Sequence, residues 1–459
     1  MGAPNKLISG EKWIADNTGN ILGYQNDRGQ FVQIPRLSAD GLSLMDGDGN
    51  LVKSRAIGKV PSRILKRGTD LVGVGVSNSG TAATVTVDAA SPFGRPAIKI
   101  AMPAGNVYTE ITLTGLGIAN FDGHIAWRIW VEDYTAVKQL IAYAGTASYT
   151  QLWQSTHSIN NSDKNRLNGE QIVVVGPTSN NSTATFVVGT DTMDSTKIRI
   201  SPEAAGANMW VETIMIPSKG RTTHVITHDD CSKTWIDNCL PLLADVGLTA
   251  TFAIETDVLN TNSALYLSSS QVAQLAAAGH QISSHNHSNT SYNDGMSGTQ
   301  TAAQYTTDFN AAVAILSGIL GSNVDTSYHP WVQGKVNQAL ITPMRAAGII
   351  IARGTEPGHN MPQLGMGMHA MRLKVQSLHT LSTAQIDQII ADSKKYGTTV
   401  IWMVHEVNIG GVGVETSRAI YEYLVNAIAR EKANGAIHMT AAQLALELQS
   451  ERLMAASLL

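Results

Sequence analysis

Val225-Ile226-Thr227-His228-Asp229-Asp230-Cys231 is a short apolar run that ends in a histidine and two adjacent aspartates. The pattern predicts a buried strand with polar groups at its carboxyl end. Further apolar runs alternate downstream with segments of helical periodicity, the helices being expected near 234–246, 270–278, 302–320, 336–347, 383–395, 416–434 and 440–452. This alternation favours a parallel sheet, doubly wound or closed as a barrel, and such sheets hold their reactive groups at the carboxyl ends of the strands.

The residues before this region follow a different pattern. Between 67 and 220 the hydrophobic residues recur with period two, as in 84–88, 97–100, 110–113, 125–130 and 197–200. Short alternating segments separated by turn residues predict an all-β sandwich of jelly-roll type, which would bind carbohydrate or act as a spacer. Its tryptophans either form a sugar-stacking platform or fill the core of the sandwich; they are Trp127, Trp130, Trp153 and Trp210.

The first 66 residues are rich in Gly, Asn and Asp and contain only short alternating pieces. A segment of this composition can hardly bury a core alone, so we expect an extended arm that depends on a partner. The sequence therefore predicts a multidomain chain: an arm over 1–66, a β-sandwich over 67–220 and an α/β domain over 221–459.

Composition excludes several classes of protein. Hydrophobic residues make up 43% of the 459 residues, which is too many for a disordered chain. With 32 Lys and Arg against 36 Asp and Glu, the net charge of -4 argues against nucleic-acid binding. No apolar stretch is long enough to span a membrane, and no signal peptide is recognisable, so we expect synthesis in the cytoplasm.

Histidine is concentrated in the α/β region, which holds eleven of the thirteen. Several follow predicted strands, where a parallel fold places its reactive groups. The segments concerned are His228-Asp229-Asp230, His285-Asn286-His287, Tyr328-His329-Pro330-Trp331 and His405-Glu406. Carboxylates and imidazoles at one sheet edge supply the ligands, the base and the acid that a metal-dependent hydrolase needs.

Taken in order, these segments resemble the motifs of the polysaccharide deacetylases, the fourth family of carbohydrate esterases. Thr227-His228-Asp229-Asp230-Cys231 is similar to the family's Thr-Phe-Asp-Asp-Gly motif, and Tyr328-His329-Pro330-Trp331 stands where the family has Arg-Pro-Pro-Tyr. The resemblance extends from about 222 to 445 and includes 247–252, 279–285 and 400–405. It implies a distorted, incomplete (β/α) barrel that binds one divalent metal, with zinc expected first and cobalt, nickel or manganese as alternatives.

Residue by residue, the resemblance implies a catalytic base at Asp229 and a general acid at His405. Asp230 and His285 would bind the metal. The family's second metal histidine lies four residues after the first, where this chain has Asn289; we favour His287 as the third ligand, with Asn289 as the alternative.

The remaining substrate-side expectations concern the Tyr328 segment. A backbone N–H near Trp331 would hold the oxyanion, His329 would either line the cleft or pack on Trp331, and Tyr328 replaces the arginine that steadies the base in the family. The aspartate that tunes the acid histidine has no clear match, and Glu356 is a poor candidate.

The resemblance and the domain order together predict a deacetylase that removes O- or N-acetyl groups from a bacterial surface polysaccharide, capsule or lipopolysaccharide. An arm, a β-sandwich and a deacetylase without a signal peptide resemble a bacteriophage tail spike: a virion-associated homotrimer, bound to tail or baseplate proteins through the arm and acting at the bacterial surface. The rival interpretation is a non-catalytic glycan-binding or structural spike with a degenerate barrel.

Overall fold

The computed structural model describes residues 63–158, 168–178, 181–217, 219–262, 264–293, 298–361, 368–408 and 415–457, and five short strands before residue 46. Met1–Val60 forms a compact unit apart from Pro61–Leu459. In the first unit an antiparallel sheet and a two-stranded pair are described, made by β1 (Lys12–Ala15), β2 (Ile21–Gln25) and β3 (Phe31–Gln33), and by β4 (Arg36–Leu37) and β5 (Leu44–Met45). The rest of the predicted arm lies outside the described residues, apart from 63–66, which belong to β6 (Arg63–Arg67).

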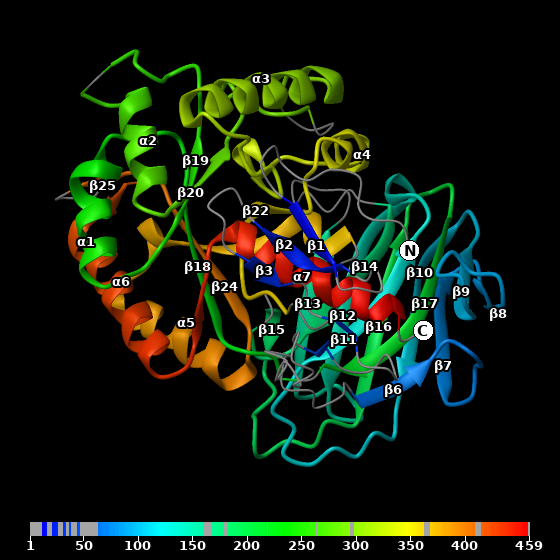
Figure 1. Cartoon of the computed structure of the whole chain (residues 1–459). Coiled ribbons are helices and arrows are strands. Elements are labelled where there is room, and N and C mark those ends of the chain that lie inside the picture. The colour runs from blue at the N-terminus through cyan, green and yellow to red at the C-terminus, as the bar shows by residue number, and fades with distance from the viewer. Residues whose placement is uncertain are drawn as a thin grey trace. The chain divides into compact units, whose positions relative to one another are not determined.

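The second unit begins with two antiparallel sheets (Figure 1). One has the order β15-β13-β12-β16-β10-β7, and the other has the order β14-β11-β17-β9-β8, with β6 paired to β17. The strands are β6 (Arg63–Arg67), β7 (Val74–Gly80), β8 (Thr84–Asp88), β9 (Ala97–Met102), β10 (Asn106–Leu113), β11 (Ile125–Val131), β12 (Val137–Gly145), β13 (Leu152–Ser158), β14 (Gly169–Val175), β15 (Asn181–Ala184), β16 (Ser195–Pro202) and β17 (Ala207–Ile216).

Alternate residues of both sheets point into one shared core. Ile98 of β9, Ile111 of β10 and Trp127 of β11 belong to the same buried cluster, so the sheets pack face to face. The predicted β-rich region is confirmed, whereas the jelly-roll topology stays a prediction. Of the four tryptophans, Trp127 and Trp153 fill this core.

The other two tryptophans lie on the opposite side of their strands, outside the core cluster. Trp130 and Trp210 are cross-strand partners on β11 and β17. Trp130 is half-buried, and the indole N–H of Trp210 donates to Asp88 at 2.8 Å. Two of the tryptophans therefore fill the core and two lie on the other side of the second sheet, where Trp210 is itself buried; a sugar-stacking role stays a prediction.

The α/β region forms a nearly closed parallel barrel, which confirms the barrel expectation. Its strands follow the order β20-β19-β18-β24-β23-β22-β21, and β27 (Ile437–His438) also pairs with β18. Every strand pair of this sheet is parallel. The barrel strands are β18 (Thr223–His228), β19 (Thr251–Ile254), β20 (Gln281–Ser284), β21 (Tyr328–Pro330), β22 (Ile351–Pro357), β23 (Leu373–Ser377) and β24 (Thr399–Val404).

A seam separates β20 from β21, the two ends of this strand order. Among the described residues no backbone ladder joins the two strands. Side chains bridge the gap instead: the Ser283 hydroxyl donates to the Tyr328 carbonyl at 2.9 Å. His329 Nδ1 lies 3.1 Å from the Ser284 carbonyl, and His285 Nδ1 lies 3.2 Å from the Pro330 carbonyl.

Helices follow the strands and surround the barrel (Figure 1). Capping boxes begin three of them, with Ser or Thr at the N-cap and Gln three residues later. The helices are α1 (Leu240–Asp245), α2 (Ser269–Ala277), α3 (Ala302–Leu320), α4 (Gln338–Ala346), α5 (Thr383–Tyr396), α6 (Arg418–Ala433) and α7 (Ala441–Ser457). A short parallel pair, β25 (Val407–Asn408) and β26 (Thr416–Ser417), precedes α6.

Three details of the barrel differ from the expectations. β23 was not expected, Tyr328–Pro330 is itself the strand β21, and an apolar strand expected from Ile349 begins only at Ile351, as β22. β21 has three residues including a proline, and so short a run carries no measurable periodicity.

The sandwich contacts the barrel through Asp122, which precedes β11. Tyr396 at the end of α5 donates its hydroxyl proton to Asp122 Oδ1 at 2.8 Å, and Lys395 pairs with Asp122 Oδ2 at 2.8 Å. Ala126, Ile172 and Met361 form a small apolar cluster across the same contact.

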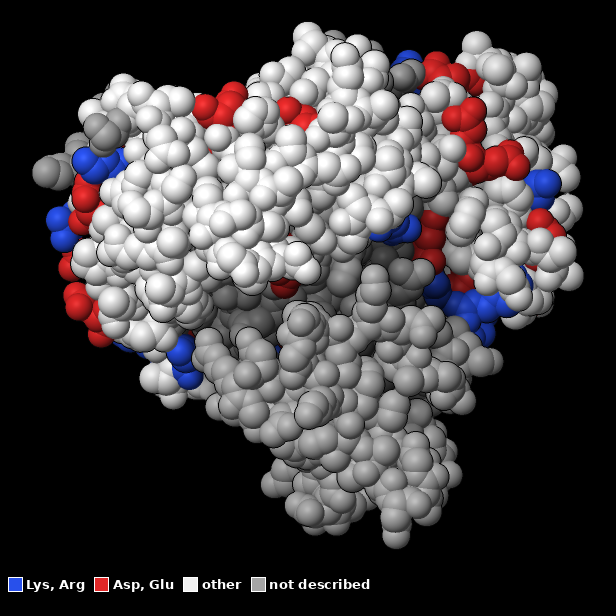
Figure 2. All heavy atoms as spheres, turned by 45° about the horizontal axis from the view of Figure 1, so that its top comes forward, with Lys and Arg blue, Asp and Glu red and all other residues white. Residues whose placement is uncertain are grey.

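Charged side chains are sparse on the face drawn in Figure 2, where neutral residues cover most of the described surface. Lys and Arg occur there in small separate groups and form no continuous basic area. Among the helices that the structure describes, none has both the length and the apolar character that crossing a membrane requires.

Candidate active site

Four of the predicted residues meet at the carboxyl edge of the barrel sheet. Asp229 and Asp230 directly follow β18, His405 follows β24, which is a neighbour of β18, and His285 follows β20, one strand further on the other side. The parallel pairing of these strands brings residues 55 to 176 positions apart in the chain to one place.

Asp230 lies between the two histidines. Its Oδ1 atom is 3.2 Å from His285 Nε2, and its Oδ2 atom is 3.9 Å from His405 Nε2. The Nδ1 atom of His285 faces the carbonyl of Pro330 at 3.2 Å, so Nδ1 carries the proton and donates it. In the neutral ring, the lone pair of Nε2 then points to the carboxylate side, which is the arrangement of a metal-binding histidine.

Asp229 is held by a buried arginine. Arg353 of β22 donates from Nη2 to Asp229 Oδ2, and the two side chains are 1% and 3% exposed. Burial alone would raise the pKa of Asp229, but the positive charge of Arg353, together with His285 and His405, holds that pKa below its usual value. Asp229 Oδ1 is buried and has no hydrogen-bond partner, so it is the oxygen free to accept a proton.

Neighbouring charges also shift the pKa values of the two metal-ligand candidates, Asp230 and His285. Burial by itself lowers the pKa of His285, yet Asp229 and the hydrogen bond to Asp230 raise it above the ordinary histidine value. Burial would raise the pKa of Asp230, and the contact with His285 lowers it overall. The pKa values of Asp229, Asp230 and His285 therefore depend on one another.

Backbone strain is concentrated at the same place. Asp230, Cys231 and Asn286 have φ angles of 79°, 65° and 70°, the left-handed region that non-glycine residues rarely adopt. Cys231 stands where the resembled motif has glycine. Such conformations cost about 1–3 kcal/mol each and cluster at functional sites.

The third predicted metal ligand is not brought into the group. His287 is half-buried and its Nδ1 atom lies 2.9 Å from the Thr256 hydroxyl. Asn289 is exposed. Within the described ranges, no three His, Cys, Asp or Glu side chains have a geometry suited to a metal ion.

The three predicted substrate-side residues lie in the interior. His329 uses both ring nitrogens, with Tyr305 Oη at 2.9 Å and the Ser284 carbonyl at 3.1 Å. The Trp331 backbone N–H, expected near the oxyanion, donates to the Arg353 carbonyl at 3.1 Å, and its indole donates to the Met371 carbonyl. Tyr328 is completely buried, and its hydroxyl accepts from Arg353 Nε at 3.1 Å. In this arrangement Tyr328 contacts Arg353, whereas His329 and Trp331 pack against Tyr305 of α3.

Sequence reasoning missed Arg353, although a lone arginine directly after the apolar residues 349–352 was a visible signal. It also missed Glu255, which follows β19 and is 7% exposed; burial and the neighbouring Asp257 raise its pKa to about 7. His379, after β23, lies beside the acid candidate, with 6.1 Å between the ring centres of His379 and His405. Glu356 forms an ion pair with Arg372.

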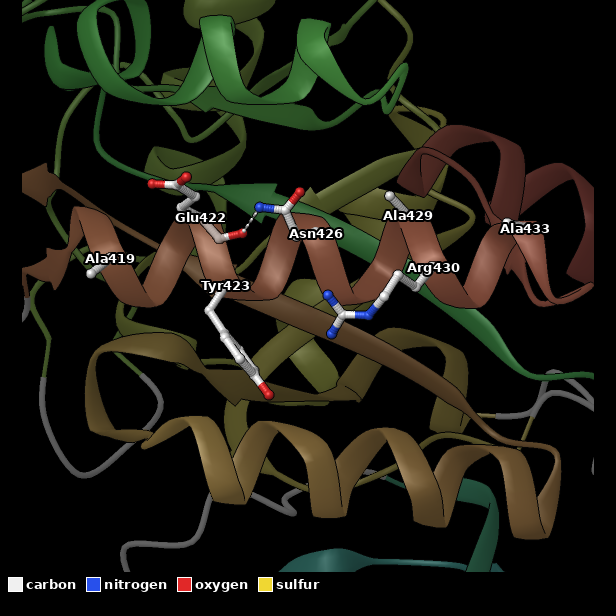
Figure 3. A pocket seen from close by; sticks show the side chains of 7 residues that line it. All are labelled: Ala419, Glu422, Tyr423, Asn426, Ala429, Arg430 and Ala433. Atoms are coloured by element: carbon white, nitrogen blue, oxygen red, sulfur yellow. Dashed lines mark hydrogen bonds between the residues drawn. The ribbon is translucent and has the colours of Figure 1, made fainter.

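A shallow pocket of about 640 Å³ lies away from these residues, on the outward face of α6 (Figure 3). Tyr423 in this pocket donates to Asp387 of α5 at 2.7 Å. Its lining residues all come from that helix: Ala419, Glu422, Tyr423, Asn426, Ala429, Arg430 and Ala433. None of them belongs to the site at the barrel edge.

The donor set is compatible with a divalent metal. Asp230 offers an anionic oxygen and His285 an imidazole Nε2 on the same side, and these are the ligand types that zinc-like metals take. The buried Asp229 Oδ1, which lacks a partner, lies one residue away. Two protein ligands are thus in place, and the third is not defined by the geometry.

Comparison with known proteins gives a family match over part of the chain. Residues 217–352 match the model of the family described as polysaccharide deacetylase, a stretch that includes Asp229, Asp230 and His285 and ends before Arg353 and His405. No curated protein sequence is significantly similar to this chain.

Several solved structures are distantly similar. A family 4 acetyl xylan esterase from Clostridium thermocellum in complex with a cobalt ion is 13% identical, over 48% of this chain and 89% of its own, with a TM-score of 0.34. A family 4 carbohydrate esterase from Streptomyces lividans in complex with acetate is 15% identical, over 48% and 94%, also with a TM-score of 0.34. The catalytic domain of a peptidoglycan N-acetylglucosamine deacetylase from Eubacterium rectale is 17% identical, over 49% and 93%, with a TM-score of 0.34.

Proposed function

We propose that this chain, which carries a polysaccharide deacetylase domain of the hydrolase kind, is a metal-dependent enzyme that removes O- or N-acetyl groups from a bacterial surface polysaccharide. One observation carries the proposal: Asp229, Asp230, His285 and His405 meet at the carboxyl edge of the barrel, with Asp230 between both imidazoles.

The residues of the chain divide the proton transfers between them. Asp229 is ionised by its contact with Arg353, and its free Oδ1 accepts a proton from the attacking water. His405 lies on the other side of Asp230 with a side chain 20% exposed, so it can reach the leaving group and donate a proton to it. Acetate and a free sugar amine or hydroxyl result.

Asp230 and His285 would hold the metal, zinc first among the candidates, with His287, or alternatively Asn289, to complete the set. When bound there, a divalent ion polarises the acetyl carbonyl and acidifies the attacking water. The Pro330 carbonyl fixes the proton of His285 on Nδ1, which keeps Nε2 available as a ligand atom.

The experiment is acetate release from acetylated xylan and from N-acetylated chito-oligosaccharides, with zinc, cobalt, nickel or manganese chloride added to metal-free protein. The proposal requires metal-dependent release that Asp229→Asn abolishes. Asp245→Asn, an exposed aspartate of α1, is the matched control and should retain full activity. Release that persists at the wild-type rate in Asp229→Asn would contradict the role of Asp229.

The order of the domains supports the finer proposal of a bacteriophage tail spike. The β-sandwich precedes the barrel, and the N-terminal unit would attach to tail or baseplate proteins. A homotrimer on the virion, acting on capsule or lipopolysaccharide, follows from that proposal. Light scattering of the purified chain tests it, since a monomer at micromolar concentration would oppose a trimeric spike.

The rival function, a non-catalytic glycan-binding or structural spike, is favoured by one observation. Within the described residues, no three His, Cys, Asp or Glu side chains have a geometry suited to a metal ion, so the third ligand is not defined. Calorimetric titration with zinc separates the two: the enzyme requires one bound ion per chain that Asp230→Ala removes, whereas the rival requires none.

A further inference from the structure

Arg353 makes the contact with Asp229 that the family resemblance assigns to a residue of a different strand. The resemblance expects the arginine that steadies the base at position 328 of β21, where this chain has tyrosine. Arg353 lies instead on β22, which pairs in parallel with β21, so that Pro330 stands opposite Arg353. Its guanidinium nevertheless reaches Asp229.

Arg353 is buried and held by hydrogen bonds at three points of its guanidinium group. The guanidinium donates to three acceptors: Asp229 Oδ2 from Nη2, the Tyr328 hydroxyl from Nε at 3.1 Å, and the Gly354 carbonyl from Nη1 at 3.3 Å. Arg353 and Tyr328 are 1% and 0% exposed. A buried arginine held at three points can neither rotate nor withdraw without losing hydrogen bonds that water cannot replace there.

We propose that Arg353 is the positioning residue for Asp229, and that it makes from β22 the contact that the resemblance expects from position 328 of β21. This inference rests on the proposed function. By occupying Oδ2, Arg353 fixes the rotation of the carboxylate and leaves Oδ1 as the only oxygen that can face a water molecule. Tyr328 acts on Arg353 in turn, because its hydroxyl fixes the Nε edge of the guanidinium.

The first experiment compares kcat, KM and zinc affinity in three variants. Arg353→Met should lower kcat about 100-fold, because a misplaced base of this kind costs about that factor, while KM and the zinc dissociation constant stay within about threefold. Arg353→Lys keeps the charge but loses the planar fork, so it should also fall, by at least tenfold, and it serves if Arg353→Met fails to fold. The exchanged double variant, Tyr328→Arg with Arg353→Tyr, should regain at least tenfold over Arg353→Met.

The rescue separates positioning from stability, because a merely structural arginine would restore folding without restoring kcat. A folded Arg353→Met or Arg353→Lys protein with kcat within threefold of wild type would overturn the inference. So would an exchanged variant that is as stable as wild type but no faster than Arg353→Met.

Crystal structures of the same variants give a readout independent of turnover. The Asp229 carboxylate should rotate in Arg353→Met and return to its original orientation in the exchanged variant. An unchanged carboxylate in Arg353→Met refutes the positioning role even if the wild-type protein releases no acetate. Absence of acetate release from wild type, with the rotation observed, would instead refute the proposed function and leave the inference standing.

Discussion

The ion pair between Asp229 and Arg353 allows a prediction about stability that can be worked from its burial. Removing one member leaves the other charged and buried, with side-chain exposures of 3% and 1%. Unit charges about 4 Å apart at an effective dielectric constant of 20 interact by about 4 kcal/mol, and breaking buried pairs costs about 3–5 kcal/mol. Arg353→Met and Asp229→Asn should therefore each lower the free energy of unfolding by about 3–5 kcal/mol.

The double variant should be far less destabilised than the sum of the single variants, because it leaves neither charge unpaired. A coupling energy of about 2–4 kcal/mol is expected from guanidinium unfolding curves. Lys394→Ala is the matched control: its ion pair with Glu431, at 2.9 Å, has side chains 50% and 15% exposed and should contribute no more than about 1 kcal/mol. Additive losses in the double variant would show that the two charges do not depend on each other.

Three further predictions follow from burial and from the ligand set. Burial lowers the pKa of four histidines, His124, His224, His228 and His329, to about 3, below the value of about 6.5 in the unfolded chain. Their contribution to the free energy of unfolding is therefore complete above pH 6.5 and falls towards pH 3, by about 1.4 kcal/mol per pH unit for each histidine. Unfolding midpoints that stay constant from pH 7 to pH 5 would contradict this prediction. Asp230→Ala and His285→Ala should each abolish zinc binding in calorimetry, and retained affinity would remove that residue from the ligand set. Trp127→Ala should cost about 3–5 kcal/mol and the half-buried Trp130 distinctly less, so equal losses would refute the division of the tryptophans.

Much of the fold was readable because long periodic segments leave little ambiguity. The helices expected near 302–320 and 383–395 occur at Ala302–Leu320 and Thr383–Tyr396, where apolar spacing and capping residues agree. β21 escaped prediction because three buried residues carry no period. β23 alternates over only five residues, which is too short to stand out beside the helix that follows.

The sequence could predict that Asp229, Asp230, His285 and His405 lie together, because each of them directly follows a barrel strand in the chain. The contact of Arg353 could not be predicted in this way. Its strand β22 is separated from β18 by β24 and β23 in the sheet, and Arg353 reaches Asp229 only across the interior of the barrel. The complete burial of Tyr328 and His329 could not be predicted for the same reason, because it depends on neighbours that are distant in the sequence. Of the two alternatives for His329, packing on Trp331 is the one found, with 5.1 Å between the ring centres, because position 329 lies within the strand β21.

The seam between β20 and β21 has a mechanical consequence. Three side-chain bonds replace a backbone ladder there, and one of them is the His285 bond to the Pro330 carbonyl. An ion bound by both His285 Nε2 and Asp230 would thus link β20, at the seam, to β18 and stabilise this edge of the barrel. Amide hydrogen exchange at β20 and β21 should consequently slow on addition of zinc, while exchange in the sandwich strands should not change.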